Sequence, residues 1–543
     1  MSLVATSRWL GQKLPAIGLL WLLNSVTWAA APDIKYVFPA GAARGAAVQV
    51  TVGGNPGGWP AQVWVDRPGI QIAAAEEQGK FAVTVAADAP PGVYWLRIYN
   101  AEGAAAPLPF IVGTLSEANE EEPNDSPAKP QSLASSNRTV NGRLEKRGDV
   151  DTFAVPLVKG QMLVAAVAAH ETLGSPMDAV LQIVSPRGSV LAQSDDERGL
   201  DPLVTFAAPA DGLYLVRIFA FPATPDASIS LAGGETFVYR LTVTTGGFLD
   251  AALPLAASRA PSTIEAFGWN ISDTDKRLTL APSADQTAVD LFLPQWAGAI
   301  SLPVVDTPAL CETEPNDLAH PQAIELPASV SGRIAEDGDR DAFRVHLAKG
   351  TTWRFKVDSR ALGYPLDSVL RLVDGSGKVL ATSDDAGKNI DAELNFTAPA
   401  DGNYTLELSD LYEHSGGRYF YRLSLEPLGP DFSLSVAQHA YAVGLGKTLE
   451  LPVTIDRRQN FSGEIEVAVV GLPDGVTCSP VKSLAQGDTA KTVKLTFTGS
   501  AVFSGPIQIV GTATEPTSRR HLAETPLSLG ARTSDLWLTV VKP

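Results

Sequence analysis

The chain has 543 residues, more than one hydrophobic core usually serves, so several domains are expected. Its formal charge of −18, without clustered lysine and arginine, argues against a nucleic-acid partner, because phosphate binding needs concentrated positive charge. The 47 glycines, 40 prolines and 45% apolar residues favour many short strands joined by tight turns over long helices. We therefore predict an all-β protein made of tandem β-sandwiches.

Residues 1–31 have the pattern of a secretory signal peptide. Arg8 and Lys13 precede an apolar run over residues 14–28, and three alanines at 29–31 offer a cleavage site. A membrane anchor is the alternative, but the run is shorter than the roughly 20 residues needed to span a bilayer. We expect an exported protein, secreted or held in the periplasm or cell envelope, with no membrane span after cleavage.

The first expected domain, residues 32–114, alternates apolar and polar residues between glycine and proline turns. This period of two is typical of half-buried antiparallel strands, and the length fits one small immunoglobulin-like sandwich. The alternation is clearest at Val48, Val50, Val52, Phe81, Val83, Val85, Tyr94, Leu96 and Ile98.

A long internal repeat dominates the centre of the chain. The sequence of residues 120–125, Glu-Glu-Glu-Pro-Asn-Asp, recurs at 312–317 as Glu-Thr-Glu-Pro-Asn-Asp. Further matches, all in the same order, are Gly148–Phe153 with Gly338–Phe343, Pro176–Asp178 with Pro365–Asp367, Ser194–Asp196 with Ser383–Asp385, Ala208–Gly212 with Ala398–Gly402, and Tyr239–Leu241 with Tyr421–Leu423. Chance does not produce so many collinear matches, so we predict two homologous domains over residues 117–245 and 311–427.

The remaining segments also alternate with a period of two. Residues 428–543 predict a further immunoglobulin-like sandwich, and residues 246–310 are expected to form a reduced immunoglobulin-like spacer, since they are short for an independent sandwich. The two cysteines, Cys311 and Cys478, fall in different expected domains. They are either free thiols or an interdomain disulfide.

The repeated motifs together resemble the bacterial pre-peptidase C-terminal domain, a relative of the clostridial collagenase collagen-binding domain. They are E-x-E-P-N-D, G-D-x-D-x-F, S-D-D and A-P-A-D-G-x-Y, and both copies carry them. Residues 39–45 resemble, more weakly, the immunoglobulin-like module that precedes such domains. The resemblance implies a jelly-roll sandwich, found on secreted hydrolases and envelope proteins, whose acidic linker and G-D-x-D-x-F turn can hold Ca²⁺.

The acidic residues of each repeat suit Ca²⁺ on chemical grounds as well. Ca²⁺ takes six to eight oxygen ligands in irregular geometry, and residues at i, i+2 and i+4 of an extended segment point the same way. Carboxylates crowded without a cation would have raised pKa values and destabilise the fold. The alternative is a solvated acidic linker with aspartates as turn formers. The candidate ligands are Glu120, Glu122, Asn124, Asp125, Asp149 and Asp151 in the first repeat, and Glu312, Glu314, Asn316, Asp317, Asp339 and Asp341 in the second.

Catalytic signatures are missing from the sequence. The six histidines are scattered, and neither an H-E-x-x-H zinc motif nor a G-x-S-x-G nucleophile elbow occurs. We therefore expect a non-catalytic binding or spacer protein of the cell envelope or extracellular space, whose partner is a protein or a glycan. The alternative is an accessory or substrate-targeting subunit of a secreted hydrolase or protease.

Overall fold

The computed structural model describes residues 30–225, 230–387, 390–516, 518–527 and 532–542. The expected signal peptide therefore lies almost entirely outside the described residues. The helical elements in the described ranges are α1 (His170–Leu173) and a 3₁₀ turn at Arg360–Leu362, and everything else that is regular is β-strand. The prediction of an all-β chain of tandem sandwiches is confirmed. None of these helices is long and apolar enough to cross a bilayer.

The first module, residues 33–113, packs two sheets around a core that includes Phe81, Tyr94 and Phe110. One sheet has the order β1 (Asp33–Phe38), β3 (Ala47–Asn55), β6 (Lys80–Val85) and β5 (Ile70–Ala74). The other has the order β2 (Gly41–Ala43), β9 (Leu108–Gly113), β7 (Gly92–Asn100) and β4 (Gln62–Val65), with β8 (Gly103–Ala104) paired to β7.

Repeat 1, residues 117–245, is a sandwich of two five-stranded sheets. The first sheet has the order β10 (Glu117–Asn119), β12 (Arg138–Arg143), β19 (Val238–Thr244), β14 (Met162–Ala168) and β17 (Leu203–Ala207). The second has the order β11 (Gln131–Ser132), β13 (Asp151–Leu157), β18 (Gly212–Pro222), β15 (Met177–Val184) and β16 (Val190–Ser194). Their inward-facing residues, Phe153 among them, form one core.

Repeat 2, residues 309–427, has the same strand order as repeat 1 in both of its sheets. The first sheet is β26 (Ala309–Cys311), β28 (Ala328–Arg333), β35 (Phe420–Pro427), β30 (Thr352–Asp358) and β33 (Glu393–Thr397). The second is β27 (Gln322–Ala323), β29 (Asp341–Leu347), β34 (Gly402–Asp410), β31 (Ser368–Asp374) and β32 (Val379–Ser383). The two segments that share motifs therefore share one topology.

In each of these three sandwiches a tyrosine hydrogen-bonds the turn that precedes its own strand, β7, β18 or β34. Tyr94, Tyr214 and Tyr404 are buried, and each hydroxyl donates to the backbone carbonyl four residues upstream at 2.9 Å. This is the hydrogen bond of a tyrosine corner.

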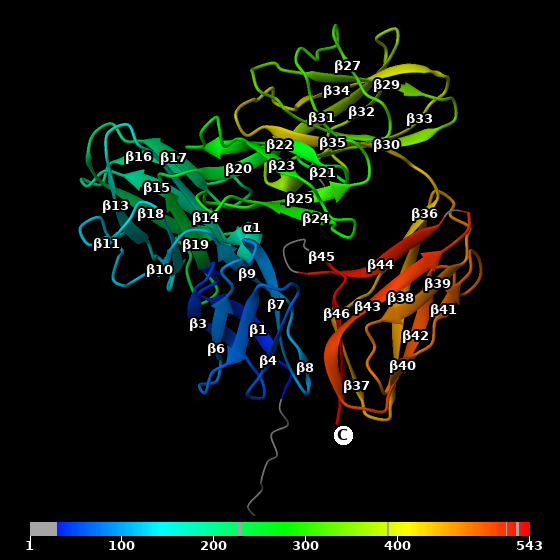
Figure 1. The fold of residues 1–543 in the computed structure, drawn as a ribbon, viewed down its shortest axis with the longest axis horizontal. Helices are drawn as coiled ribbons and strands as arrows, with labels where there is room; N and C mark the ends of the chain where they lie inside the picture. Colours follow the sequence, from blue (N-terminus) through cyan, green and yellow to red (C-terminus); the bar gives the residue numbers. More distant parts are fainter. Residues whose placement is uncertain (1–29, 226–229, 388–389, 517, 528–531, 543) are drawn as a thin grey trace, which may run out of the picture.

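The spacer between the repeats has a small core of its own, which includes Ile264 and Trp296. Two three-stranded sheets enclose it: β20 (Phe248–Leu253), β22 (Ser262–Trp269) and β23 (Arg277–Leu280), and β21 (Ala257–Ser258), β25 (Ile300–Val305) and β24 (Ala288–Leu291). Figure 1 shows the spacer strands (green) between the strands of the two repeats.

The last module, residues 431–541, winds one 11-stranded sheet around a single core. The main path is β37 (Ala440–Gly444), β46 (Leu536–Val541), β43 (Phe503–Ala513), β44 (Arg519–Pro526), β36 (Asp431–Ser435), β38 (Thr448–Arg458), β42 (Thr492–Gly499) and β40 (Val476–Cys478). Three further strands pair beside it, β39 (Ile465–Val470), β41 (Val481–Ser483) and β45 (Arg532–Thr533).

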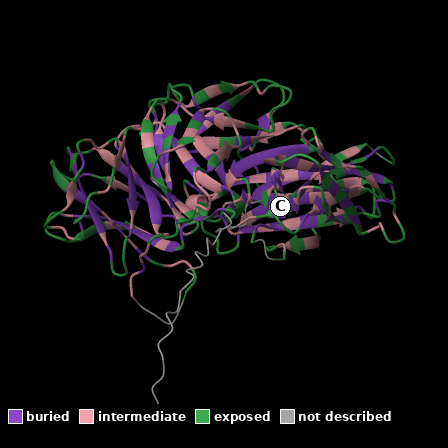
Figure 2. Ribbon diagram, turned by 90° about the horizontal axis from the view of Figure 1, so that it is seen from below, coloured by how far each residue is buried: buried purple, intermediate pink, exposed green. Residues whose placement is uncertain are grey.

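The modules are arranged so that the chain turns back on itself. The last module packs beside the first, where β8 contacts β37 and β46 (Figure 1). Figure 2 shows the buried residues along the strands and many exposed residues in the loops. Cys311 and Cys478 are both free thiols, so the alternative of an interdomain disulfide is wrong.

Candidate metal centre

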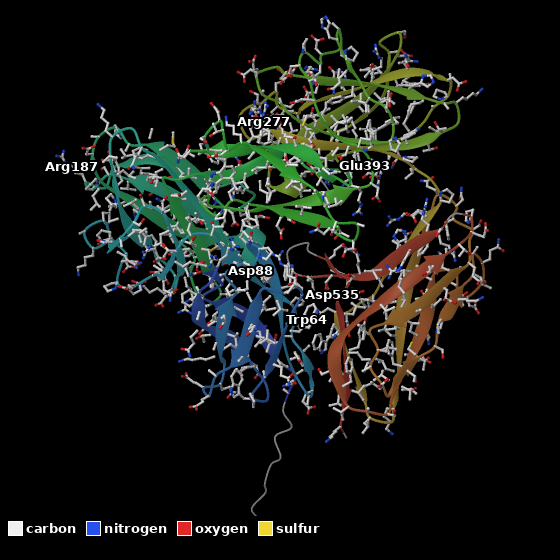
Figure 3. The ribbon with its side chains drawn as sticks, in the orientation of Figure 1. Trp64, Asp88, Arg187, Arg277, Glu393 and Asp535 are labelled. Carbon is white, nitrogen blue, oxygen red and sulfur yellow. The ribbon has the colours of Figure 1, made fainter. Side chains whose placement is uncertain are left out.

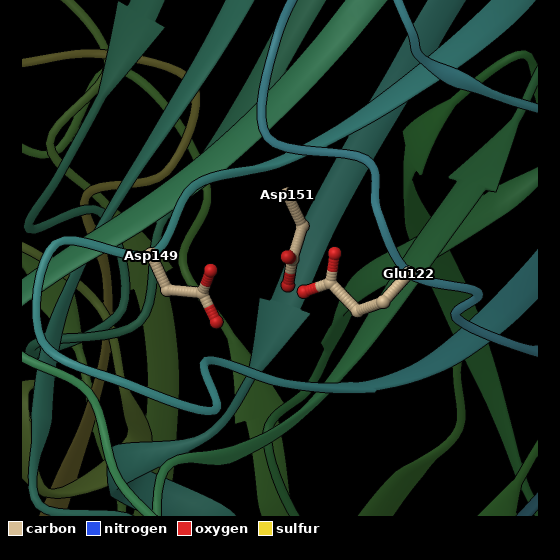
Figure 4. Close-up of side chains that lie close together, drawn as sticks. All are labelled: Glu122, Asp149 and Asp151. Atoms are coloured by element: carbon tan, nitrogen blue, oxygen red, sulfur yellow. The ribbon is translucent and has the colours of Figure 1, made fainter.

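Three carboxylates converge at the edge of each repeat. In repeat 1, ligand oxygens of Glu122, Asp149 and Asp151 lie within 4.8 Å of one another (Figure 4). Asp151 is the first residue of β13, Asp149 ends the turn before it, and Glu122 comes from the segment between β10 and β11. Repeat 2 forms the same group from Glu314, Asp339 and Asp341.

The turn before β13 is built by its own sequence. Gly148 has φ of +87°, a left-handed conformation that glycine adopts without steric cost. Asp149 Oδ2 then accepts a hydrogen bond from the backbone N–H of Glu145 at 2.5 Å, which closes the turn. In repeat 2, Gly338 has φ of +80° and Asp339 Oδ2 accepts from the N–H of Ala335 at 2.8 Å.

Each group also has a buried asparagine beside it. Asn124 is fully buried, its backbone N–H donates to Glu122 Oε2 at 3.0 Å, and its carbonyl accepts from Thr152 N–H at 3.1 Å. Asn316 donates in the same way to Glu314 Oε2 at 3.1 Å. These backbone bonds fix the acidic segment against the start of the following strand.

Buried polar atoms at the two groups lack hydrogen-bond partners in the part of the chain that the structure describes. They include both amide atoms of Asn124, the Oδ1 atoms of Asp149 and Asp151, the Nδ2 of Asn316 and the Oδ1 of Asp341. Buried oxygens without a donor are costly, and here they are the hard carboxylate and amide oxygens that Ca²⁺ prefers. The residues present therefore fit a divalent cation.

A buried tyrosine lies beside each carboxylate group, and its hydroxyl orients one of the aspartates by a hydrogen bond. The hydroxyl of Tyr239 lies 2.6 Å from Asp151 Oδ2 and 3.0 Å from Glu120 Oε2. In repeat 2, Tyr421 lies 2.6 Å from Asp341 Oδ2 and 2.9 Å from Glu312 Oε2. Tyr239 and Tyr421 are not among the candidate ligands expected from the sequence, although the recurrence of Tyr-Arg-Leu in both repeats was a signal.

Glu120 and Glu312 are bonded to these tyrosines and are not members of the carboxylate groups themselves. Glu120 Oε1 accepts from the backbone N–H of Arg143 at 2.7 Å, and Glu312 Oε1 accepts from Arg333 N–H at 2.7 Å. Each glutamate shares its tyrosine hydroxyl with the aspartate that begins the following strand, Asp151 or Asp341. Each therefore helps to orient a candidate ligand.

Crowding and burial make these carboxyl groups weak acids. Burial and then the charge of Asp151 raise the pKa of Glu120 to about 10, and burial raises the pKa of Asp151 to about 7. In repeat 2, burial and the charge of Glu312 raise the pKa of Asp341 to about 9. Without a cation these raised pKa values favour the protonated forms of Glu120, Asp151 and Asp341, and a divalent ion would compete with those protons.

Asp125 and Asp317, two further candidate ligands, are not members of the carboxylate groups, and their partners differ. Asp125 is half-exposed and lies 3.9 Å from Lys146 Nζ, which is also 3.7 Å from Asp149 Oδ1. Asp317 instead accepts from the backbone N–H groups of Ala319 at 2.9 Å and His320 at 2.8 Å, so it caps its own turn.

Comparison with known proteins finds a family model that matches part of repeat 2. Residues 339–410 match the family model of the bacterial pre-peptidase C-terminal domain. The chain is also similar to a probable subtilase-type serine protease of Deinococcus radiodurans, at 31% identity over 239 residues. That match covers 43% of this chain and 26% of the protease, so the chain spans about a quarter of the relative's length.

Two solved structures show similarity to parts of the chain. The pre-peptidase C-terminal domain of a collagenase from Bacillus anthracis is 20% identical, with 19% of this chain and 93% of that domain covered and a TM-score of 0.17. The fibronectin(III)-like modules of CbhA from Clostridium thermocellum are 11% identical, with 36% and 88% covered and a TM-score of 0.13. From the family match over residues 339–410, the chain carries a bacterial pre-peptidase C-terminal domain.

Proposed function

We propose that this chain is an exported, non-catalytic binding or spacer protein whose two repeats are stabilised by Ca²⁺. The observation that carries the proposal is the pair of matched carboxylate groups, Glu122 with Asp149 and Asp151, and Glu314 with Asp339 and Asp341. Each is built by the same elements in the same order, which a merely solvated acidic linker has no reason to reproduce.

Ca²⁺ fits this donor set better than zinc does. The donors are carboxylate and amide oxygens, with neither the sulfur nor the imidazole ligands that zinc favours. The three carboxylates come from two separate segments, so a bound ion would tie the linker segment to the start of the strand. The expected role is structural, because the ion would hold two parts of a sandwich together.

The proposed partner is a protein or a glycan of the envelope or extracellular space. Sandwich modules bind through loops and exposed faces, and this chain presents several such modules. The spacer role is supported by contacts between modules, including the ion pair of Arg67 with Asp290 at 2.6 Å between the first module and the spacer.

A second candidate is an accessory or substrate-targeting part of a secreted protease. The similarity to a probable subtilase-type protease favours it, since the matched stretch is only part of that protein. Under this proposal the chain would position a partner enzyme or its substrate, and would itself turn over neither.

Calorimetric titration of the full chain with Ca²⁺ tests the metal proposal. Extracellular Ca²⁺ modules commonly have dissociation constants of about 0.1–1 mM, so about 2 mM Ca²⁺ should stabilise a repeat by roughly 0.6–2 kcal/mol. The double variant Glu122→Gln with Glu314→Gln should lose this response. The control Glu121→Gln, an exposed neighbour outside the group, should keep it. No binding tighter than about 10 mM in the unmodified chain would refute the proposal.

A further inference from the structure

The contact between the first and last modules is centred on a buried arginine. Arg97 on β7 is fully buried and reaches into the last module, where its Nη2 donates to the carbonyl of Asp535 at 2.8 Å. Its Nη1 lies 3.2 Å from His439 Nδ1 and 3.4 Å from the His439 carbonyl oxygen. These partners are 342 and 438 residues away in the sequence.

Aromatic side chains seal this contact. The ring of Trp537, itself buried, lies 5.5 Å from the Arg97 guanidinium, 4.6 Å from the Tyr99 ring and 6.2 Å from the Trp64 ring. Trp537 Nε1 donates to Ser504 Oγ at 3.0 Å, and Ser504 Oγ donates to the Asn100 carbonyl at 3.1 Å. Figure 3 labels Trp64 and Asp535 where the two modules meet.

The chemistry of Arg97 fixes the protonation of His439. A guanidinium has N–H donors only and stays protonated, so the Nδ1 that faces it must present a lone pair. His439 is therefore neutral, with its proton on Nε2. A protonated His439 would place an N–H and a second positive charge against Arg97 at the same distance.

Few negatively charged groups lie close enough to Arg97 to compensate a second positive charge on His439. In the described ranges no carboxylate oxygen lies within 4.0 Å of Arg97, and its charge is met by carbonyl oxygens and an aromatic face. The Asp535 carboxylate acts on Arg97 only at longer range, and its Oδ1 accepts from Gln508 Nε2 at 3.0 Å. The backbone of His439 cannot move away freely, because its carbonyl accepts from Trp537 N–H at 2.9 Å.

We infer that this contact is a pH-sensitive latch, in which protonation of His439 opposes Arg97 and releases the last module (residues 431–541) from the first (residues 33–113). Burial, and then the charge of Arg97, lower the pKa of His439 in the closed form. The open form, with its ordinary pKa near 6.5, therefore binds protons more readily. Docking is fully stable above about pH 6.5 and weakens as the pH falls from there toward the lowered value.

Besides Asp535, Asp66 is a titratable group at this contact. It accepts from Trp95 N–H at 2.9 Å, and burial raises its pKa, with the charge of Asp535 acting in the same direction and the charge of Arg67 against it. On acidification it would also lose a negative charge near Arg97. The test must therefore separate His439 from Asp66.

Small-angle X-ray scattering of the full chain between pH 8 and pH 5 tests the latch. We expect the radius of gyration to rise reversibly below about pH 6.5, while circular dichroism stays unchanged because the modules remain folded. His439→Asn keeps an acceptor oxygen near the Nδ1 position and cannot be protonated, so this variant should stay compact throughout. Asp66→Asn should open at the same pH as the unmodified chain.

His346→Asn is the matched control, because His346 is exposed on repeat 2, far from this contact in the sequence, with its Nδ1 3.2 Å from Asn403 Oδ1. It should open like the unmodified chain. The inference is overturned if the unmodified chain stays compact at pH 5, or if His439→Asn opens at the same pH as the unmodified chain. A loss of opening in Asp66→Asn alone would equally overturn it, since the switch would then be the carboxyl group.

Discussion

Arg418, just before β35 of repeat 2, donates its Nε–H to Asp250 Oδ2 on β20 of the spacer at 2.8 Å. The other oxygen of Asp250 accepts from Arg198 of repeat 1 at 2.5 Å, so one buried carboxylate links three modules. Arg418 also lies 3.0 Å from Glu197 Oε1 of repeat 1. The two repeats are thus joined through the spacer and to each other.

Asp250→Ala should destabilise this junction by about 3–5 kcal/mol, because it leaves two guanidinium groups without their shared partner in a buried place. Denaturant unfolding of the full chain measures the loss. Asp306→Ala removes an exposed ion pair with Arg259 in the same spacer and should cost at most about 1 kcal/mol. Equal effects of the two variants would contradict a special role for Asp250.

Tyr421→Phe should weaken Ca²⁺ binding at repeat 2 by roughly 10–100-fold, because the hydroxyl that orients Asp341 is lost. Calorimetric titration gives the affinity. Tyr404→Phe is the control, since its hydroxyl bonds the Ala400 carbonyl in the corner of the same repeat. It should reduce stability and leave Ca²⁺ affinity unchanged, and a similar loss of affinity in both variants would argue against the orienting role.

The two sites should differ in affinity. Lys146 lies 3.7 Å from Asp149 in repeat 1, whereas the matching position in repeat 2 is Glu336. We expect repeat 2 to bind Ca²⁺ more tightly, and Lys146→Glu to strengthen binding at repeat 1, because it replaces a positive charge beside Asp149 with a negative one. Lys129→Glu makes the same charge change on an exposed residue of repeat 1 and should have a smaller effect. Titration of each variant with repeat 2 silenced by Glu314→Gln isolates the site.

Stability without metal should fall as the pH rises. The pKa of Asp341 is raised to about 9 in the fold, above its ordinary value of 3.8. Its contribution is therefore full below about pH 4 and is lost as the pH rises toward 9. Ca²⁺ should reverse the trend, because binding needs the deprotonated groups and releases protons. Melting temperatures at pH 5 and pH 8, with chelator or with Ca²⁺, check this, and a chelated chain more stable at pH 8 would contradict it.

The period-two alternation was enough to predict the all-β class, because each strand buries one face, as in β42, where Val493, Leu495 and Phe497 are buried. The ordered repeat motifs likewise located the two segments that share a topology. These features are local in sequence, so the sequence displays them directly.

The candidate site was only partly predictable. Asp149 and Asp151 are close in sequence, and the structure brings them together with Glu122. The expectation that Glu120, Glu122 and Asn124 converge assumed an extended strand, but β10 ends at Asn119 and the acidic segment follows no strand alternation. Tyr239 approaches from β19, far along the chain, because sheet pairing rather than local sequence places it there.

The contact of Arg97 with His439 had no sequence signal at all. Neither residue belongs to a motif, and their modules meet only because the intervening modules fold the chain back. Contacts of this kind depend on the sum of several packing geometries.

Because the first and last modules are tethered through the rest of the chain, their docking is intramolecular and has a high effective concentration. An interface too weak to hold two separate proteins together can then remain closed. Cutting the chain between repeat 2 and the last module would turn the same contact into a bimolecular one that depends on dilution. The intervening sandwiches thus contribute to the affinity of a contact between two other modules.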